Sequence, residues 1–202
     1  MIRAFLAVEL ADLLRDGLAS LQIALKQRLH RAVSRDVRIS WVSPASSHLT
    51  IKFLGDIDES IVAPLCAAVT QAMQAHSPLE IPLERLGVFP RVQQPRVLWV
   101  GPTDAWQQGE DAKRLAALHA EVETCCRSFD LALESRGLSP HLTLARIKEG
   151  QRDVGQALTS SGALQAAVSL GTLAVASIAL MRSELKPSGS VYTRLWKARL
   201  GA

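Results

Sequence analysis

Apolar and polar residues alternate along this chain with two different periods, and each period predicts one kind of element. Four stretches carry apolar residues at helical spacing and predict helices: 12–32, 59–76, 110–129 and a short one at 153–158. The other stretches are rich in aliphatic residues, several with a period of two, and predict strands: 2–10, 37–42, 48–54, 79–86, 96–100, 141–147, 168–185 (one strand or a pair) and 191–200.

The order of these elements predicts the fold class. Several strands follow one another with no helix between them, which favours antiparallel pairing and an α+β fold with helices outside the sheets. The order strand-strand-helix-strand-strand recurs around each copy of a repeated tetrapeptide, so we expect a bilobal molecule with a central groove. No linker rich in Gly, Pro or Ser separates the halves, and residues 1–202 are expected to form one domain of two closely packed lobes.

The repeated tetrapeptide is the strongest chemical signal in the chain. His48-Leu49-Thr50-Ile51 returns as His141-Leu142-Thr143-Leu144, each time within a predicted strand. Side chains alternate between the faces of a strand, so each copy presents a histidine and a threonine on one face and buries two aliphatic residues. Two imidazoles can divide the roles of general acid and general base, and hydroxyl groups can donate to phosphate oxygens. The pattern therefore predicts acid-base chemistry on a phosphate ester, and these residues suffice without a metal or a cofactor.

A metal site is the competing interpretation of the two histidines, but a third ligand is missing from the sequence around them. The remaining histidines, His30, His76 and His119, lie in helical or helix-end sequence and are interpreted as surface or local residues. Phe5, Trp41, Phe89 and Trp99 are candidates for the core, although one of them could stack against a nucleobase.

Two cations follow the repeated motif. Strict alternation places Lys52 on the face of His48, whereas Arg146 falls on the face opposite His141, unless a bulge or the end of the strand brings it round. Either side chain is alternatively a solvated surface cation.

Composition narrows the class of protein. Apolar residues make up 48% of 202 residues, the net charge is +4, and the pI of about 9.3 favours anionic partners such as phosphate or RNA. The three cysteines, Cys66, Cys125 and Cys126, lack metal-type spacing and are expected to be buried thiols of a reducing compartment. The apolar start reads as a strand and not as a signal peptide, and the apolar stretch 163–181 reads as strands. We therefore expect a cytoplasmic protein that does not span a membrane.

Five segments together resemble the RNA 2′,3′-cyclic phosphodiesterase branch, also called 2′-5′ RNA ligase, of the two-histidine phosphoesterase superfamily. They are RAFLAVEL at 3–10, WVSPASSHLTIKFLGD at 41–56, GVFPRVQQPRVLWVG at 87–101, PHLTLAR at 140–146 and RSELKPSGSVYTRL at 182–195. The resemblance spans nearly the whole chain. It departs from the family pattern at Leu138, where an aromatic residue is common.

The resemblance implies two antiparallel sheets related by a pseudo-twofold and flanked by helices, with the motif strands lining the groove. It implies hydrolysis of a terminal 2′,3′-cyclic phosphate on RNA to a 2′-phosphate, without metal. His48 would be the proton donor to the departing 3′-oxygen, and His141 the proton acceptor that activates water. Thr50 and Thr143 would hold the phosphate, and Arg146 matches the arginine that follows the family's second motif.

Two alternatives stay open at this point. The same groove would suit 2′-5′ RNA ligation or cleavage of a 2′-5′ linkage. A non-catalytic module that binds RNA ends would also explain the positive charge, although it has no need of two matched histidines. The expected partner in each case is RNA, with a 2′,3′-cyclic phosphate end for the hydrolase, and we expect a monomer.

Overall fold

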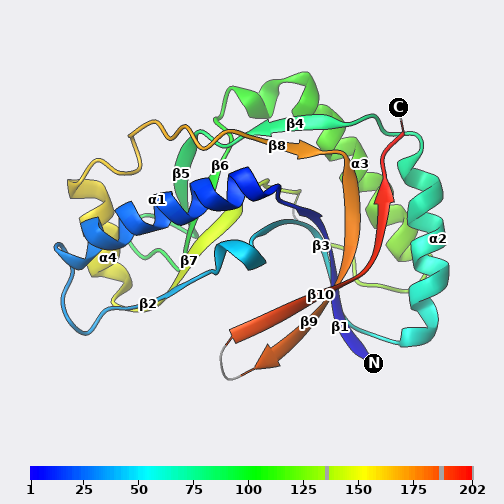
Figure 1. Ribbon diagram of the computed structural model, residues 1–202, viewed down its shortest axis with the longest axis horizontal. Coiled ribbons are helices and arrows are strands. Elements are labelled where there is room, and N and C mark those ends of the chain that lie inside the picture. Colours follow the sequence, from blue (N-terminus) through cyan, green and yellow to red (C-terminus); the bar gives the residue numbers. More distant parts are fainter. Residues whose placement is uncertain (135–136, 187–188, 202) are drawn as a thin grey trace.

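The computed structural model describes residues 1–134, 137–186 and 189–201, and it has the α+β fold that the sequence predicts (Figure 1). Its strands are β1 (Ile2–Glu9), β2 (Arg38–Trp41), β3 (His48–Ile57), β4 (Leu79–Pro82), β5 (Arg85–Phe89), β6 (Val97–Gly101), β7 (Leu142–Glu149), β8 (Thr172–Val175), β9 (Ser177–Lys186) and β10 (Gly189–Arg199). Its α-helices are α1 (Asp12–His30), α2 (Val62–Met73), α3 (Glu110–Arg127) and α4 (Gln151–Ser160), and its 3₁₀ turns are η1 (Pro44–Ser46), η2 (Glu59–Ile61) and η3 (Trp106–Gln108). Pro187 and Ser188, which belong to the last segment of the resemblance, lie outside the described residues.

Two four-stranded antiparallel sheets form the lobes. The first has the order β10-β9-β1-β3 and the second the order β2-β7-β6-β5, so each lobe contains one motif strand. A two-stranded sheet, β4-β8, is additional to the two that the sequence predicts. It arises because the predicted strand 79–86 divides after Pro82, which has no N–H to continue a ladder. The predicted strand 168–185 likewise divides into β8 and β9.

The helices bury the stripes that the sequence predicts and cover different sheets. Leu14, Leu18, Leu25 and Leu29 are the buried leucines of α1. Figure 1 shows α1 crossing the second sheet, whereas α2 and α3 lie against the first. The buried side chains of both lobes form one continuous cluster.

The structure also bears on the cysteines and on membrane spans. All three cysteines are free and buried, and burial raises the pKa of Cys66 to about 11 and of Cys126 to about 12, which keeps these thiols protonated. Within the described part of the chain, no helix is long and apolar enough to cross a bilayer.

Candidate active site

The two histidines of the repeated motif are held in the same way. His48 is the first residue of β3, and His141 immediately precedes β7, the strand of the other lobe that β3 contacts. Nδ1 of His48 lies 2.9 Å from the carbonyl oxygen of Ser46, and Nδ1 of His141 lies 2.8 Å from that of Ser139. A carbonyl oxygen can only accept a hydrogen bond, so Nδ1 carries the proton in both rings. This leaves both Nε2 atoms for proton transfer.

A β-bulge interrupts the first motif strand at Ile51, the last residue of the motif. The register between β1 and β3 shifts between the pairs Leu6–Lys52 and Ala7–Thr50, so Ile51 and Lys52 are buried one after the other. The faces of Lys52 and Phe53 are thereby exchanged, and Lys52 does not share the face of His48. The prediction from strict alternation is wrong for Lys52, because alternation counts residues along one strand and ignores its partner's register.

The second motif strand carries a matching bulge. The register between β6 and β7 shifts between the pairs Leu98–Ala145 and Trp99–Thr143, and Leu144 and Ala145 are both buried. Arg146 therefore returns to the face of His141 and Thr143, and its side chain is exposed. Strict alternation had placed it on the opposite face, and the bulge is the physical reason for the difference.

Lys52 is neither a site residue nor a surface cation. It is fully buried, and its Nζ donates to both oxygens of Glu123 on α3 at 2.8 and 2.9 Å and to the carbonyl oxygen of Ala132 at 2.8 Å. His119, one turn before Glu123, is 8% exposed, and its Nε2 lies 3.5 Å from the Glu123 carboxylate. Of the two alternatives for His119, a surface or a local residue, the structure supports the local one, because α3 packs this face of the helix against β3 and the neighbour of His119 lies one turn along the same helix.

The positive charge of Arg146 acts on both histidines. Burial lowers the pKa of His48, although its hydrogen bond to Ser46 raises it, and the charges of Arg146 and His141 lower it further. Burial also lowers the pKa of His141, with the hydrogen bond to Ser139 opposing and the charge of Arg146 adding to the shift. Both imidazoles are thus predisposed to be neutral, and each can accept or return one proton near its lowered pKa.

The two threonines complete the polar face of each motif. Thr50 and Thr143 are half-buried on the faces of His48 and His141. In the ladders Thr50 lies opposite Ala7 and Thr143 opposite Trp99. The structure therefore places one imidazole and one hydroxyl-bearing side chain on the same face of each motif.

Aromatic rings fix the orientation of each imidazole. Phe5 stacks on His48 with a centroid distance of 4.6 Å, and Tyr192 meets His48 edge-on at 5.1 Å. On the other side, Phe89 meets His141 edge-on at 5.0 Å, and Trp99 lies at 6.2 Å. Three of these aromatics had been left open between the core and a stacking role. Tyr192 was missed because nothing local to β10 indicates its contact with β3.

Gly87 makes room for the ring of Trp99. A Cβ atom at this position would lie 2.1 Å from the Trp99 ring, so the ring lies directly over the backbone of β5. A glycine in a strand often marks such a close approach. Gly87 thereby lets Trp99 reach the side of His141.

Gln22 on α1 supports the second motif from behind. Its buried side-chain amide donates to the carbonyl oxygens of Val42 at 2.7 Å and of Leu144, the bulge residue, at 3.0 Å. The sequence contained a signal for this residue, because Gln22 is a polar interruption of the leucine stripe of α1. A buried amide inside an apolar stripe requires hydrogen-bond partners.

A pocket of about 190 Å³ lies beside His48. His48, Ser47 and Tyr192 are among its lining residues, together with charged side chains from β1, α1 and β10. Within the described residues, no three His, Cys, Asp or Glu side chains are grouped as metal ligands would be.

Comparison with known proteins finds a family model and named relatives that match most of this chain. The family model described as LigT like Phosphoesterase matches residues 14–99 and 108–192. A relative from Methanothermobacter thermautotrophicus, named RNA 2′,3′-cyclic phosphodiesterase, is 33% identical over 98% of this chain and 99% of its own length. A relative of the same name from Aquifex aeolicus is 31% identical over 87% of this chain and 89% of its own.

Solved structures share the fold. The protein TT0787 of Thermus thermophilus aligns with a TM-score of 0.69 and 29% identity, covering 98% of each chain. LigT of E. coli, solved in complex with 3′-AMP, aligns with a TM-score of 0.70 over 100% of this chain and 99% of its own, at 20% identity.

Proposed function

The chain belongs to the LigT-like phosphoesterase family, and on this premise we propose that it is an RNA 2′,3′-cyclic phosphodiesterase that hydrolyses a terminal cyclic phosphate to a 2′-phosphate. The names of its relatives support the reaction class. The observation that carries the proposal is the matched pair of Nδ1–carbonyl hydrogen bonds, which leaves the Nε2 atoms of both histidines available for proton transfer. The charge of Arg146 lowers the pKa of both histidines.

The proposed reaction uses each histidine once. Neutral His141 takes a proton from water through Nε2 while the water oxygen forms a bond to phosphorus. The bond from phosphorus to the 3′-oxygen breaks, and protonated His48 gives its proton to that oxygen. The products are a 3′-hydroxyl and a 2′-phosphate, and the protein ends with His48 neutral and His141 protonated. Acid-base assistance of this kind typically contributes ~10²–10⁴-fold in rate.

Thr50, Thr143 and Arg146 are proposed to bind the phosphate. Hydroxyl groups on the faces of the two histidines are suited to donate to the non-bridging oxygens. Arg146 adds a charge that favours the anionic transition state. Its place on the face of His141, restored by the bulge, supports this role.

The remaining properties are proposals of the same kind. The continuous core supports one domain of two lobes over residues 1–202. We propose a cytoplasmic monomer that acts on RNA ends. The reaction needs neither metal nor cofactor in this proposal, because the histidines, threonines and Arg146 supply every role in it.

The test is hydrolysis of an oligoribonucleotide with a 2′,3′-cyclic phosphate end, in the presence of EDTA, with the product isomer identified by phosphorus NMR. His48→Ala and His141→Ala should each lose ~10²–10⁴-fold in rate. His30→Ala, an exposed residue of α1, is the control and should keep full activity. Loss of wild-type activity in EDTA, or full activity in both site variants, would overturn the mechanism.

The same experiment separates the other functions. Joined products or cleaved 2′-5′ linkages would favour ligation or linkage cleavage. Tight binding without turnover over a wide pH range would identify a binding module.

A further inference from the structure

We infer that the pocket beside His48 is a subsite for the phosphodiester that links the terminal nucleotide of the RNA to the nucleotide before it. The inference rests on the proposed function and concerns the substrate class, because it assigns a preference for an RNA chain over a mononucleotide. It is carried by the position of the pocket, its charges and an unsatisfied arginine.

The pocket is continuous with the candidate active site. His48 lines it, and so does Tyr192, whose ring meets His48 edge-on. Glu9, also in the lining, is the residue of β1 that lies opposite His48 in the ladder. A substrate whose cyclic phosphate reaches His48 therefore has this pocket immediately beside it.

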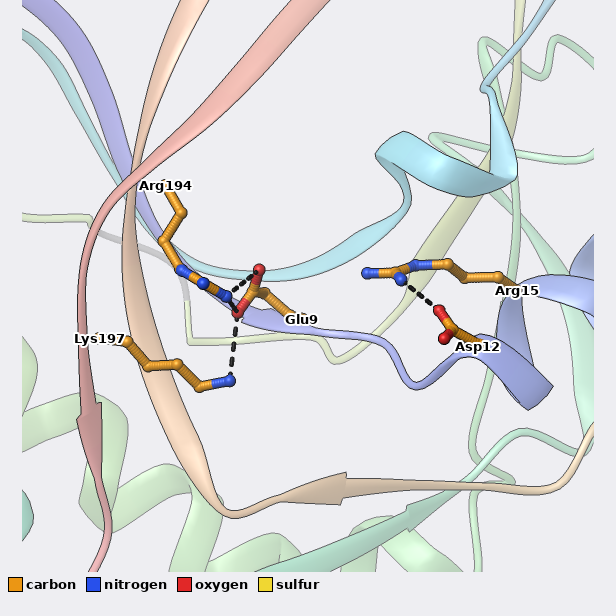
Figure 2. Close-up of polar contacts among 5 residues, drawn as sticks. All are labelled: Glu9, Asp12, Arg15, Arg194 and Lys197. Atoms are coloured by element: carbon orange, nitrogen blue, oxygen red, sulfur yellow. Dashed lines mark hydrogen bonds and ion pairs between the residues drawn. The ribbon is translucent and has the colours of Figure 1, made fainter.

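Two arginines reach this space from different elements. Figure 2 shows Arg194 of β10 and Arg15 of α1 pointing toward one another, with Glu9 between them on the side of Arg194. Nη1 of Arg194 donates to both oxygens of Glu9 at 3.1 and 2.9 Å, and Nζ of Lys197 donates to Oε2 at 3.2 Å. The donors on the other guanidinium nitrogens of Arg194 are not used in this pair.

Arg15 is held less completely. Its Nη1 donates to Asp12 at 2.7 Å, but Asp12 is 92% exposed, so water competes strongly for this contact. Its Nε is buried and has no hydrogen-bond partner within the described part of the chain. A buried N–H without an acceptor is costly, so the guanidinium of Arg15 is incompletely satisfied as it stands. The Arg15 side chain is 31% exposed, and its accessible nitrogens can donate to an anion bound in the pocket.

The charges favour one anion. Burial raises the pKa of Glu9, but hydrogen bonds from Arg194 and Lys197 outweigh it, and the net pKa is lowered. Glu9 is therefore ionised and neutralises one of its two partners. The cations here are Arg15, Arg194 and Lys197, and the carboxylates are Glu9 and Asp12. Three positive charges against two negative charges leave one positive charge in excess. A singly charged phosphodiester matches this excess, and guanidinium groups bind such oxygens in a directed geometry.

The chemistry of the substrate identifies which phosphodiester this is. At the end of an RNA the cyclic phosphate occupies both hydroxyls of the last ribose. The nearest other phosphate is the one on the 5′ side of that ribose. A nucleoside 2′,3′-cyclic phosphate lacks it, and a dinucleotide with the same end carries it.

The experiment compares kcat/KM for these two substrates in the wild type, Arg15→Gln and Arg194→Gln. Each variant should lose about 10-fold on the dinucleotide, the typical effect of removing one charged hydrogen bond, and change by less than about 2-fold on the mononucleotide. Arg28→Gln, an exposed residue near the far end of α1, is the matched control and should change neither.

A third substrate separates charge from mere chain length. A dinucleotide with an uncharged methylphosphonate linkage should react like the mononucleotide in the wild type. The dependence of log kcat/KM on log salt concentration should also be shallower by about 0.7 in either variant.

Two results would overturn the inference: no preference for the charged dinucleotide in the wild type, or an equal loss on both substrates in the arginine variants. Failure of the proposed function looks different, because the wild type would then turn over no substrate. Anisotropy of a labelled dinucleotide 2′-phosphate would still report, through weaker binding to Arg15→Gln and Arg194→Gln, whether the pocket binds the linkage.

Discussion

The two halves of the candidate site share a motif but are supported by different means. Each half has a histidine whose Nδ1 donates to the carbonyl two residues earlier, a threonine two residues later, and a bulge after that. Behind the first half lies a buried ion pair between Lys52 and Glu123 of α3. Behind the second half lies the neutral amide of Gln22 from α1.

The residues after the bulges also differ. Lys52 and Ala145 occupy matching positions, and both are turned inward. Phe53 and Arg146 occupy the next matching position, on the face of the histidines, where both side chains are exposed. The repeat thus specifies where an imidazole and a hydroxyl lie, and the following two residues give each half its own chemistry.

The largest expected effect distinguishes the roles of the two histidines. On an RNA cyclic phosphate, His48→Gln and His141→Gln should both lose ~10²–10⁴-fold in kcat. On a p-nitrophenyl phosphodiester the leaving group departs as a stable anion and needs no proton. His48→Gln should then recover most of its activity, whereas His141→Gln should stay impaired because water still has to be activated.

Equal recovery, or recovery in His141→Gln alone, would contradict the assignment of His48 as the donor. His76→Gln, a variant outside both motifs, is the control and should behave as the wild type with both esters.

The second effect concerns stability and compares the two supports, the Lys52–Glu123 ion pair and the Gln22 amide. Lys52→Ala gives the first half the residue that the second half has at the matching position. It leaves the Glu123 carboxylate buried without its partner and should lower the free energy of unfolding by about 3–5 kcal/mol. Gln22→Leu removes a neutral donor and should cost less, about 1–3 kcal/mol. Urea titrations monitored by circular dichroism would measure both, and a larger loss in Gln22→Leu would reverse the comparison.

The third effect tests the cation that only the second half presents. Arg146→Gln should lower kcat/KM by roughly 10–100-fold, because a charged donor to the phosphate is lost. Burial lowers the pKa of both histidines, and the charge of Arg146 lowers them further. Arg146→Gln should therefore raise the pKa of both histidines, and both limbs of the bell-shaped pH profile should move to higher pH.

Arg152→Gln, an exposed arginine of α4, is the control for this shift. A profile of Arg146→Gln that keeps both limbs in place would show that Arg146 does not act on the imidazoles.

The local pattern of apolar and polar residues predicted most of the helices and strands. It failed where the face of a side chain depends on how its strand pairs with a neighbouring strand. The helix at 12–32 and the strand at 48–54 followed from the spacing of apolar residues, and the two histidines and two threonines stood out because their tetrapeptide is repeated. The faces of Lys52 and Arg146 did not, because a bulge depends on the register of a neighbouring strand. The partner of Lys52 is Glu123, 71 residues away, and no local pattern connects them.

The smallest expected effect concerns Phe53, the counterpart of Arg146 in the first half. The residue is 59% exposed, and its ring centroid lies 6.2 Å from that of Phe5, which itself stacks on His48. An exposed aromatic beside a nucleotide site can stack a base, and such contacts contribute ~1–3 kcal/mol per base. Because Phe53 is more than half exposed, Phe53→Leu should act near the lower end of this range and raise KM about 5-fold, with kcat unchanged. Ribose 2′,3′-cyclic phosphate, which has no base, should show no difference between Phe53→Leu and the wild type, and Ile23→Ala, a change at an exposed position of α1, should affect neither substrate. An equal rise in KM for the baseless substrate would mean that Phe53 supports His48 through Phe5, and the two halves would then differ in their support and not in what they bind.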